Sequence, residues 1–320
     1  MANLKEQEAM IGVIYRPEVE PFPTQVRKFI FNKDTGAFMG RTASSWAKIC
    51  TFYLIFYIGL ASLFSLLMFI LCYTLDPRIP KYQLESSLIG TNPGLGFRPM
   101  PNDSNSLSTL IWYKGTSKKD FEYWTNSLTE FLESYRVLGD TAGRGANIAN
   151  CDFARGRPDG KVCSVNVKNL MPCVPENNFN YHLQGPCIFL KLNRIFGWKP
   201  NIYEPTELPE NMPPSLKQDI QSLVKENEYQ KNTIWVSCEG ETPADVEHVG
   251  PISYKPYPGF PAYFFPYENN EGYLSPIVAV LFENPKTGIL INIECKAWAK
   301  NIIHDRKERL GSVHFELMID

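Results

Sequence analysis

The chain has 320 residues, enough for one large domain or two medium ones. Its 32 Lys and Arg side chains nearly balance its 34 Asp and Glu side chains. The resulting net charge of −2 excludes the strongly basic composition that is typical of nucleic-acid-binding proteins, and we expect no nucleic-acid partner.

The first 48 residues hold seven Lys and Arg side chains against five Asp and Glu side chains. They lack a sustained apolar period and include Pro17, Pro21 and Pro23, so we expect a mostly irregular tail over 1–48. Asp34-Thr35-Gly36 matches an aspartic-protease triplet, but a protease dyad needs a second such loop, and a turn is the simpler interpretation.

Residues 49–75 form a run of 27 residues without a charge, bounded by Lys48 and Asp76. As a helix this run would be about 40 Å long, more than the roughly 30 Å of a bilayer core. It is also too long for the apolar region of a cleaved signal peptide. The run therefore predicts one membrane-spanning anchor helix that stays in the protein, surrounded by membrane lipid.

The orientation of this helix follows from the cysteines more clearly than from the flanking charges, which differ little between its two ends. Cys50 and Cys72 lie within the helix, and the sequon Asn102-Asp103-Ser104 lies after it. The remaining cysteines all follow it too: Cys151, Cys163, Cys173, Cys187, Cys238 and Cys295. This one-sided distribution indicates an oxidising compartment. We expect a type II single-pass protein of the plasma membrane, with a cytoplasmic N-terminus and a glycan at Asn102.

Residues 76–115 are rich in Pro, Gly, Ser and Asn, and we expect an extracellular stalk with little regular structure from 76 to 110. Residues 116–320 are expected to form the extracellular domain. A capping-type start at 117–120 followed by apolar residues at helical spacing predicts a helix that ends at Gly139, and a shorter helix is expected from about Pro213. The predicted strands are 187–192, 233–238, 274–282, 288–298 and 312–319.

Side-chain alternation places Cys238 on the apolar face of one predicted strand and Cys295 on the apolar face of another. Two inward cysteines at this separation indicate an inter-sheet disulfide in an immunoglobulin-like sandwich. Short loops favour Cys151 with Cys163 and Cys173 with Cys187, but six cysteines allow many pairings, so the connectivity stays open at this point. The fold class is therefore mainly β: an immunoglobulin-like sandwich with inserted helices and disulfides, behind one membrane helix.

No motif in the sequence indicates catalysis. The glycine-rich stretch 139–145 lacks the Lys-Ser/Thr of a phosphate-binding loop, and the four histidines lack metal-ligand spacing. Neither a Gly-x-Ser-x-Gly elbow nor an Asp-x-Asp pair occurs. We expect no catalytic residue, no metal site and no cofactor.

The membrane helix carries an aromatic stripe made of Tyr53, Phe56, Tyr57 and Phe64. Small residues that let helices approach closely in lipid lie nearby: Gly59, Ala61, Ser62 and Ser65. The tyrosines fit either an interfacial belt or a docking face for another membrane helix, and both interpretations stay open.

Ordered motifs over nearly the whole chain resemble those of the β subunits of the sodium/potassium-transporting ATPase and the related proton/potassium ATPase. They are Lys28-Phe29-Ile30-Phe31-Asn32, Gly40-Arg41-Thr42 with Ser45-Trp46, Phe52-Tyr53 with Phe56-Tyr57, Pro93-Gly94-Leu95-Gly96-Phe97-Arg98-Pro99, Gly185-Pro186-Cys187, Leu192-Asn193-Arg194 with Lys199-Pro200, Phe265-Pro266-Tyr267, Tyr273-Leu274-Ser275-Pro276 and Cys295-Lys296-Ala297-Trp298-Ala299.

This resemblance implies a non-catalytic β subunit of a P-type sodium/potassium pump. It implies disulfides between successive cysteines, and a role in folding, membrane delivery and potassium affinity of a catalytic α subunit. The anchor would pack beside the seventh and tenth α helices through Tyr53, Phe56 and Tyr57. The outer domain would meet an extracellular α loop through Phe264, Phe265, Pro266 and Tyr267, and a small single-span regulatory subunit is a further expected partner.

Three alternatives stay open from the sequence. The chain could serve a proton/potassium pump, act as a stand-alone type II adhesion protein, or be a type II lumenal enzyme, although the last lacks the motifs of an active site.

Overall fold

The computed structural model describes residues 21–101, 108–115, 117–136, 146–308 and 310–320. The chain divides into two compact units, Met1–Leu75 and Asp76–Asp320, which are described separately. Asn102, the glycine-rich stretch 139–145 and the predicted helix end at Gly139 lie outside the described residues.

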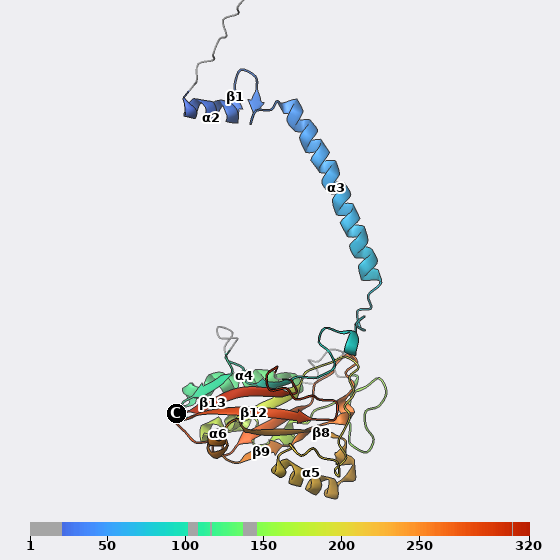
Figure 1. Cartoon of the computed structure of the whole chain (residues 1–320), viewed down its shortest axis with the longest axis vertical. Helices are drawn as coiled ribbons and strands as arrows, with labels where there is room; N and C mark the ends of the chain where they lie inside the picture. The colour runs from blue at the N-terminus through green and yellow to red at the C-terminus, as the bar shows by residue number, and fades with distance from the viewer. Residues whose placement is uncertain (1–20, 102–107, 116, 137–145, 309) are drawn as a thin grey trace, which may run out of the picture. The chain divides into compact units, whose positions relative to one another are not determined.

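The described part of the first unit consists of a short helix, a two-stranded hairpin and a long helix (Figure 1). Its elements are α2 (Phe22–Ile30), β1 (Phe31–Asn32), β2 (Ala37–Phe38) and α3 (Ala43–Tyr73). The expectation of a mostly irregular tail is wrong for the described part, because Pro23 lies in the first turn of α2, where proline is tolerated. Asp34-Thr35-Gly36 forms the turn between β1 and β2, and Gly36 has a φ of 63°.

The helix α3 confirms that the predicted anchor segment is helical, and it begins six residues earlier and ends two residues earlier than the uncharged run. It has 31 residues and no buried side chain, and among the described residues it alone is long and apolar enough to cross a membrane. At about 1.5 Å per residue it is roughly 46 Å long.

The second unit is a sandwich of two sheets (Figure 1). One sheet has the strand order β10-β8-β12-β13-β4 and the other has the order β3-β7-β11-β9. All neighbours are antiparallel except β13 and β4, which are parallel. The strands are β3 (Leu95–Arg98), β4 (Leu110–Tyr113), β7 (Cys187–Leu192), β8 (Thr233–Gly240), β9 (Ile252–Lys255), β10 (Gly259–Pro261), β11 (Ile277–Phe282), β12 (Leu290–Trp298) and β13 (Ser312–Ile319).

The predicted strands are confirmed, with small differences at their ends. The expectation of a stalk with little regular structure is wrong for part of that region, because β3 and β4 are strands of the two sheets. Their alternate side chains are buried: Leu95, Phe97, Ile111 and Tyr113. These two strands are only four residues long, and their hydrogen-bonding partners lie far along the chain. The sandwich therefore includes residues from 95 onwards.

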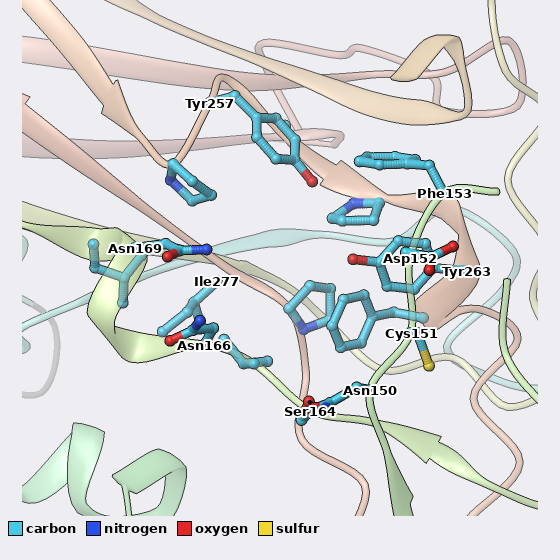
Figure 2. A pocket seen from close by; sticks show the side chains of 17 residues that line it. Asn150, Cys151, Asp152, Phe153, Ser164, Asn166, Asn169, Tyr257, Tyr263 and Ile277 are labelled. Carbon is cyan, nitrogen blue, oxygen red and sulfur yellow. Dashed lines mark hydrogen bonds between the residues drawn. The ribbon is translucent and has the colours of Figure 1, made fainter. Parts of the chain in front are cut away.

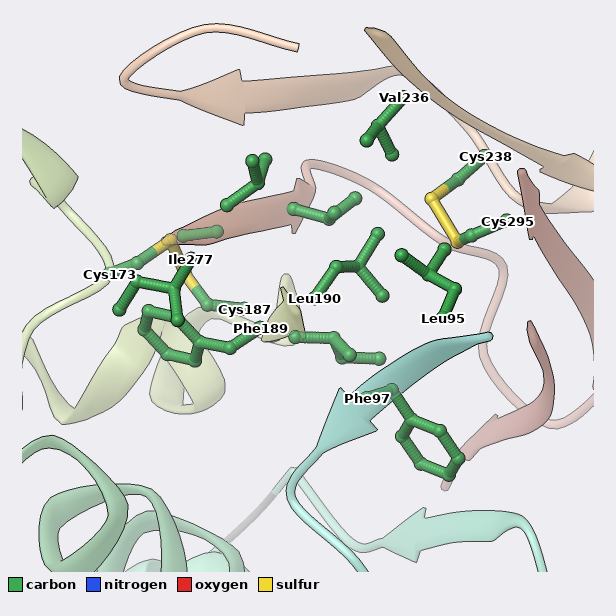
Figure 3. Packing of buried hydrophobic residues seen from close by; sticks show 14 of the residues in the cluster. Leu95, Phe97, Cys173, Cys187, Phe189, Leu190, Val236, Cys238, Ile277 and Cys295 are labelled. Carbon is green, nitrogen blue, oxygen red and sulfur yellow. A yellow bond between two sulfur atoms is a disulfide. The ribbon is translucent and has the colours of Figure 1, made fainter. Parts of the chain in front are cut away.

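Aromatic rings fill the space between the two sheets. Phe315 of β13 packs on Phe97 of β3, with ring centroids 5.0 Å apart, and on Phe282 of β11 at 6.1 Å. All three side chains are buried. Figure 3 shows Leu95 and Leu190 in the same core beside a disulfide. Burial of this apolar area is the main source of stability for the sandwich.

Helices cover the outer faces of the sandwich. The predicted helix α4 (Lys118–Arg136) packs Phe131 against Phe189 of β7, with ring centroids 6.0 Å apart. The predicted helix α5 (Pro214–Glu226) covers Trp235 and Trp298 on the other side (Figure 1). A short helix, α6 (Pro243–His248), and a two-stranded parallel pair, β5 (Ile148–Ala149) with β6 (Val162–Cys163), complete the unit.

The three disulfides join successive cysteines: Cys151–Cys163, Cys173–Cys187 and Cys238–Cys295. Both members of the last pair point into the core, as the alternation predicts (Figure 3). The inter-sheet placement is wrong, however, because Cys238 of β8 and Cys295 of β12 are register partners on neighbouring strands of one sheet, with Cα atoms 4.0 Å apart. The link between the sheets here is instead a hydrogen bond of 2.7 Å from the backbone N–H of Cys238 to the Tyr254 hydroxyl of β9.

We predict that Cys238→Ser with Cys295→Ser lowers the free energy of unfolding of the outer domain by about 2–4 kcal/mol, because the bond closes a long loop in the unfolded chain. Urea unfolding of the full chain in detergent, followed by tryptophan fluorescence, measures this change. Cys50→Ala with Cys72→Ala is the control, since both thiols are free and lie in α3. An unchanged midpoint in the Ser variant would contradict the prediction.

Candidate functional site

The described residues contain no group of three or more His, Cys, Asp or Glu side chains placed to hold a metal ion. Two other features are candidates for function. One is the aromatic surface of α3, and the other is an aromatic segment of the outer domain, residues 256–277.

The aromatic surface of α3 consists of four rings that contact one another in turn. Tyr53 stacks on Tyr57, with centroids 6.1 Å apart, and Phe52 stacks on Phe56 at 6.3 Å. Edge-to-face contacts of 5.4 Å join Phe52 to Tyr53 and Phe56 to Tyr57. Pairs at i and i+4 lie on one helix face, so the rings make one continuous surface. At least half of each side chain is exposed, and a partner could cover all four.

The structure places the other predicted members of this face along the same exposed helix. Gly59 has open space where a Cβ atom would stand, so a neighbouring helix could approach closely there. Phe64 is exposed about two turns beyond Tyr57. Phe52 was not among the predicted contact residues, although its spacing of four from Phe56 is a signal that could have included it.

The aromatic segment of the outer domain contains the predicted contact residues Phe264, Phe265, Pro266 and Tyr267. Phe264 is buried, with its ring stacked 5.0 Å from that of Tyr263, so it supports the segment from inside. The other three are half-buried and present part of their surface to solvent.

An arginine holds the backbone of this segment. Arg157 donates one hydrogen bond of 3.0 Å to the carbonyl oxygen of Pro266 and another of 3.0 Å to the carboxylate of Glu268. Only 15% of the Arg157 side chain is exposed, whereas 43% of the Glu268 side chain is, so the ion pair lies at the edge of the surface. Hydrogen bonds with a charged donor or acceptor are stronger than those between neutral groups.

A second arginine lies among tyrosine rings. The guanidinium carbon of Arg194 is 5.5 Å from the ring centroid of Tyr267 and 5.2 Å from that of Tyr273, and Arg194 Nε donates to Ser275 Oγ at 3.1 Å. Burial raises the pKa of Tyr273 to about 12, although the nearby positive charge of Arg194 acts in the opposite direction. The phenol therefore stays protonated at neutral pH, and the cation–π contacts fix the end of the segment.

Sequence reasoning missed both arginines as site residues. Arg157 lies 109 residues from Pro266 and belongs to no motif, so nothing in the sequence connects the two. Arg194 stands in one of the motifs that carry the family resemblance, but its contact with Tyr267 and Tyr273 is visible only in the fold.

A cavity of about 540 Å³ adjoins the segment (Figure 2). Figure 2 shows Phe153, Tyr257 and Tyr263 along one side and Asn150 and Asn166 along the other. Phe153 contacts Tyr263 edge to face, with centroids 5.3 Å apart. Burial raises the pKa of Tyr257 and of Tyr263, so both phenols stay neutral. The cavity offers aromatic stacking surfaces, neutral hydrogen-bonding groups and the carboxylate of Asp152, a combination that suits the binding of a ligand.

We predict that Arg157→Met loosens the segment and destabilises the outer domain by about 1–3 kcal/mol, because it leaves the Pro266 carbonyl and the Glu268 carboxylate without this partner. Hydrogen exchange of residues 265–270 should accelerate. Lys300→Met is the control, because it removes a solvent-exposed pair with Glu207 that is worth at most about 1 kcal/mol. Equal exchange in the two variants would refute this role for Arg157.

Comparison with known proteins gives a consistent result. The family model described as "Sodium / potassium ATPase beta chain" matches residues 17–315. The chain is 55% identical over 306 residues to the sodium/potassium-transporting ATPase subunit beta-2 of Drosophila melanogaster, covering 95% of each chain. It is 41% identical to subunit beta-1 of the same species, covering 94% of this chain and 95% of that protein. It is 28% identical to human subunit beta-2, covering 92% and 93%.

Proposed function

Since this chain belongs to the sodium/potassium ATPase beta chain family, we propose that it is the non-catalytic subunit that binds the catalytic α chain of a sodium/potassium pump. The observation that carries this proposal is the match to the family over nearly the whole chain, membrane helix and outer domain included. The relatives named above are all sodium/potassium subunits, which favours this pump over a proton/potassium pump.

The proposed membrane contact is the aromatic surface of α3. Tyr53, Phe56 and Tyr57, together with Phe52, would pack beside the seventh and tenth helices of the α chain. Burial of these rings against protein would replace contacts with lipid, and close packing in lipid relies on such shape complementarity. Because α3 has no buried side chain, its other faces leave room for a small single-span regulatory subunit.

The proposed extracellular contact is the surface of Phe265, Pro266 and Tyr267, with Phe264 supporting it from below. Arg157 and Arg194 hold this segment before any partner arrives, which lowers the entropic cost of binding an α loop. Through this contact the chain would support folding and membrane delivery of the α chain and modulate its potassium affinity.

The proposed location is the plasma membrane, with residues 1–48 cytoplasmic, 49–75 in the membrane and the remainder outside. All three disulfides lie after α3, which supports an extracellular outer domain. In this proposal the extracellular stalk is residues 76–94, and the outer domain is residues 95–320, because β3 already belongs to the sandwich.

We predict that Tyr53→Ala with Tyr57→Ala reduces recovery of the α chain in mild detergent by about tenfold or more, since truncating a central interface aromatic commonly costs about 2 kcal/mol or more. Phe69→Ala with Tyr73→Ala is the matched control, because this pair also stacks, at 6.4 Å, but lies at the other end of α3. Recovery of the α chain is measured by affinity purification of the tagged chain. An equal loss of the α chain in both variants would show that the two tyrosines do not form a specific interface with it.

We also predict that Asn102→Gln and Ser104→Ala each abolish a glycosidase-sensitive shift in gel mobility, because either change destroys the sequon. The measurement uses full chain recovered from the cell surface. A wild-type chain whose mobility does not respond to the glycosidase would contradict a glycan at Asn102.

A further inference from the structure

The helix α2 has an apolar face that the described chain leaves uncovered. Phe22, Val26, Phe29 and Ile30 lie on one side at helical spacing, with Thr24 on the opposite side. No residue of α2 is buried, and 79% of Phe22 and 57% of Phe29 are exposed. A helix of nine residues is too short to be stable in water by itself, so a surface that covers this face would stabilise it.

The hairpin that follows extends the apolar face and ties it to the membrane helix. Phe38 and Met39 are about half exposed, and the backbone N–H of Met39 donates to the Ile30 carbonyl at 3.0 Å. The indole N–H of Trp46, in the first turns of α3, donates to the Phe38 carbonyl at 2.8 Å. The hairpin therefore contacts both α2 and the N-terminal end of α3.

The charge around this face is strongly positive. Residues 21–48 hold one acidic side chain, Asp34, and five basic ones: Arg27, Lys28, Lys33, Arg41 and Lys48. A short amphipathic helix with aromatic residues on one face and basic residues beside it is typical of segments that lie in the plane of an anionic membrane surface.

We propose that α2 and the β1–β2 hairpin form a lipid-binding surface on the leaflet from which α3 enters the membrane. Phe22, Phe29 and Ile30 insert at the boundary between headgroups and acyl chains, and Arg27 and Arg41 lie against anionic headgroups. The occupant is lipid rather than another protein, since the face is continuous with a membrane-spanning helix and its charge complements that of the cytoplasmic leaflet. This inference rests on the cytoplasmic N-terminus of the proposed function.

Such a surface has a mechanical consequence for α3. The uncharged part of the helix, Ile49 to Tyr73, is roughly 38 Å long, whereas the bilayer core is about 30 Å thick, so hydrophobic matching alone leaves its depth and tilt undetermined. An attached interfacial helix fixes the N-terminal end at one membrane surface. It thereby sets the depth at which Tyr53 and Tyr57 lie.

The test compares two positions on opposite faces of α2. Phe22→Cys and Thr24→Cys are each introduced into full chain that lacks Cys50 and Cys72, labelled with an environment-sensitive fluorophore, and placed in nanodiscs. With phosphatidylcholine containing about 30% phosphatidylserine, acrylamide should quench the probe at position 22 several-fold less than the probe at position 24. The difference should shrink in phosphatidylcholine alone and in the variant Arg27→Gln, Lys33→Gln, Arg41→Gln.

Equal quenching at the two positions in all discs would overturn the proposal. So would protection of position 22 that requires a co-purified large subunit and does not respond to phosphatidylserine, because the face would then bind protein. The comparison of lipid compositions uses chains in which Arg27, Lys33 and Arg41 are unchanged, so it remains decisive if the triple variant misfolds. The quenching is measured both in discs that contain the chain alone and in discs that also contain any co-purified large subunit. Recovery of an ATPase partner is scored separately, so failure of this inference is distinguishable from failure of the proposed function.

Discussion

The cost of exposing α3 to water is the constraint on which the rest of the structure depends. All its backbone hydrogen bonds except those at its ends are made within the helix, and its side chains from Ile49 onwards carry no charge, so lipid is the solvent in which it is stable. In the proposed topology, the residues before α3 and the residues after it lie on opposite sides of the membrane. The six cysteines after α3 are joined in three disulfides, which fits an oxidising compartment on that side.

The binding surface proposed for the outer domain depends on the packing beneath it. Every residue of β11 is buried. The aromatic segment that leads into β11 is held by hydrogen bonds from Arg157 and Arg194. These two arginines contact carbonyl, carboxylate, hydroxyl and aromatic-ring partners within the domain. Their arrangement fixes the shape of the segment in advance, which would lower the entropic cost of the proposed binding to another chain.

The sequence predicts elements whose signal is local, and it fails where the deciding contact is remote. β7 and β13 were predicted with their observed bounds, and alternation correctly directed Cys238 and Cys295 into the core. Side-chain alternation shows which face of a strand a residue lies on, but it does not show which strand is the neighbour. The disulfide between Cys238 and Cys295 is therefore predicted between sheets, although it lies within one sheet. The strands β3 and β4 are short and pair with distant strands, so the surrounding prolines and glycines dominated the prediction there. The contact residues on α3 and in the aromatic segment stay predictions.

Purification of the complex from native membranes in mild detergent, through a tag on this chain, directly tests whether it is a pump subunit. We predict that a large subunit is recovered in equal amount and hydrolyses ATP when sodium and potassium are both present. Repeated recovery of the folded, disulfide-bonded chain without such a subunit would contradict it.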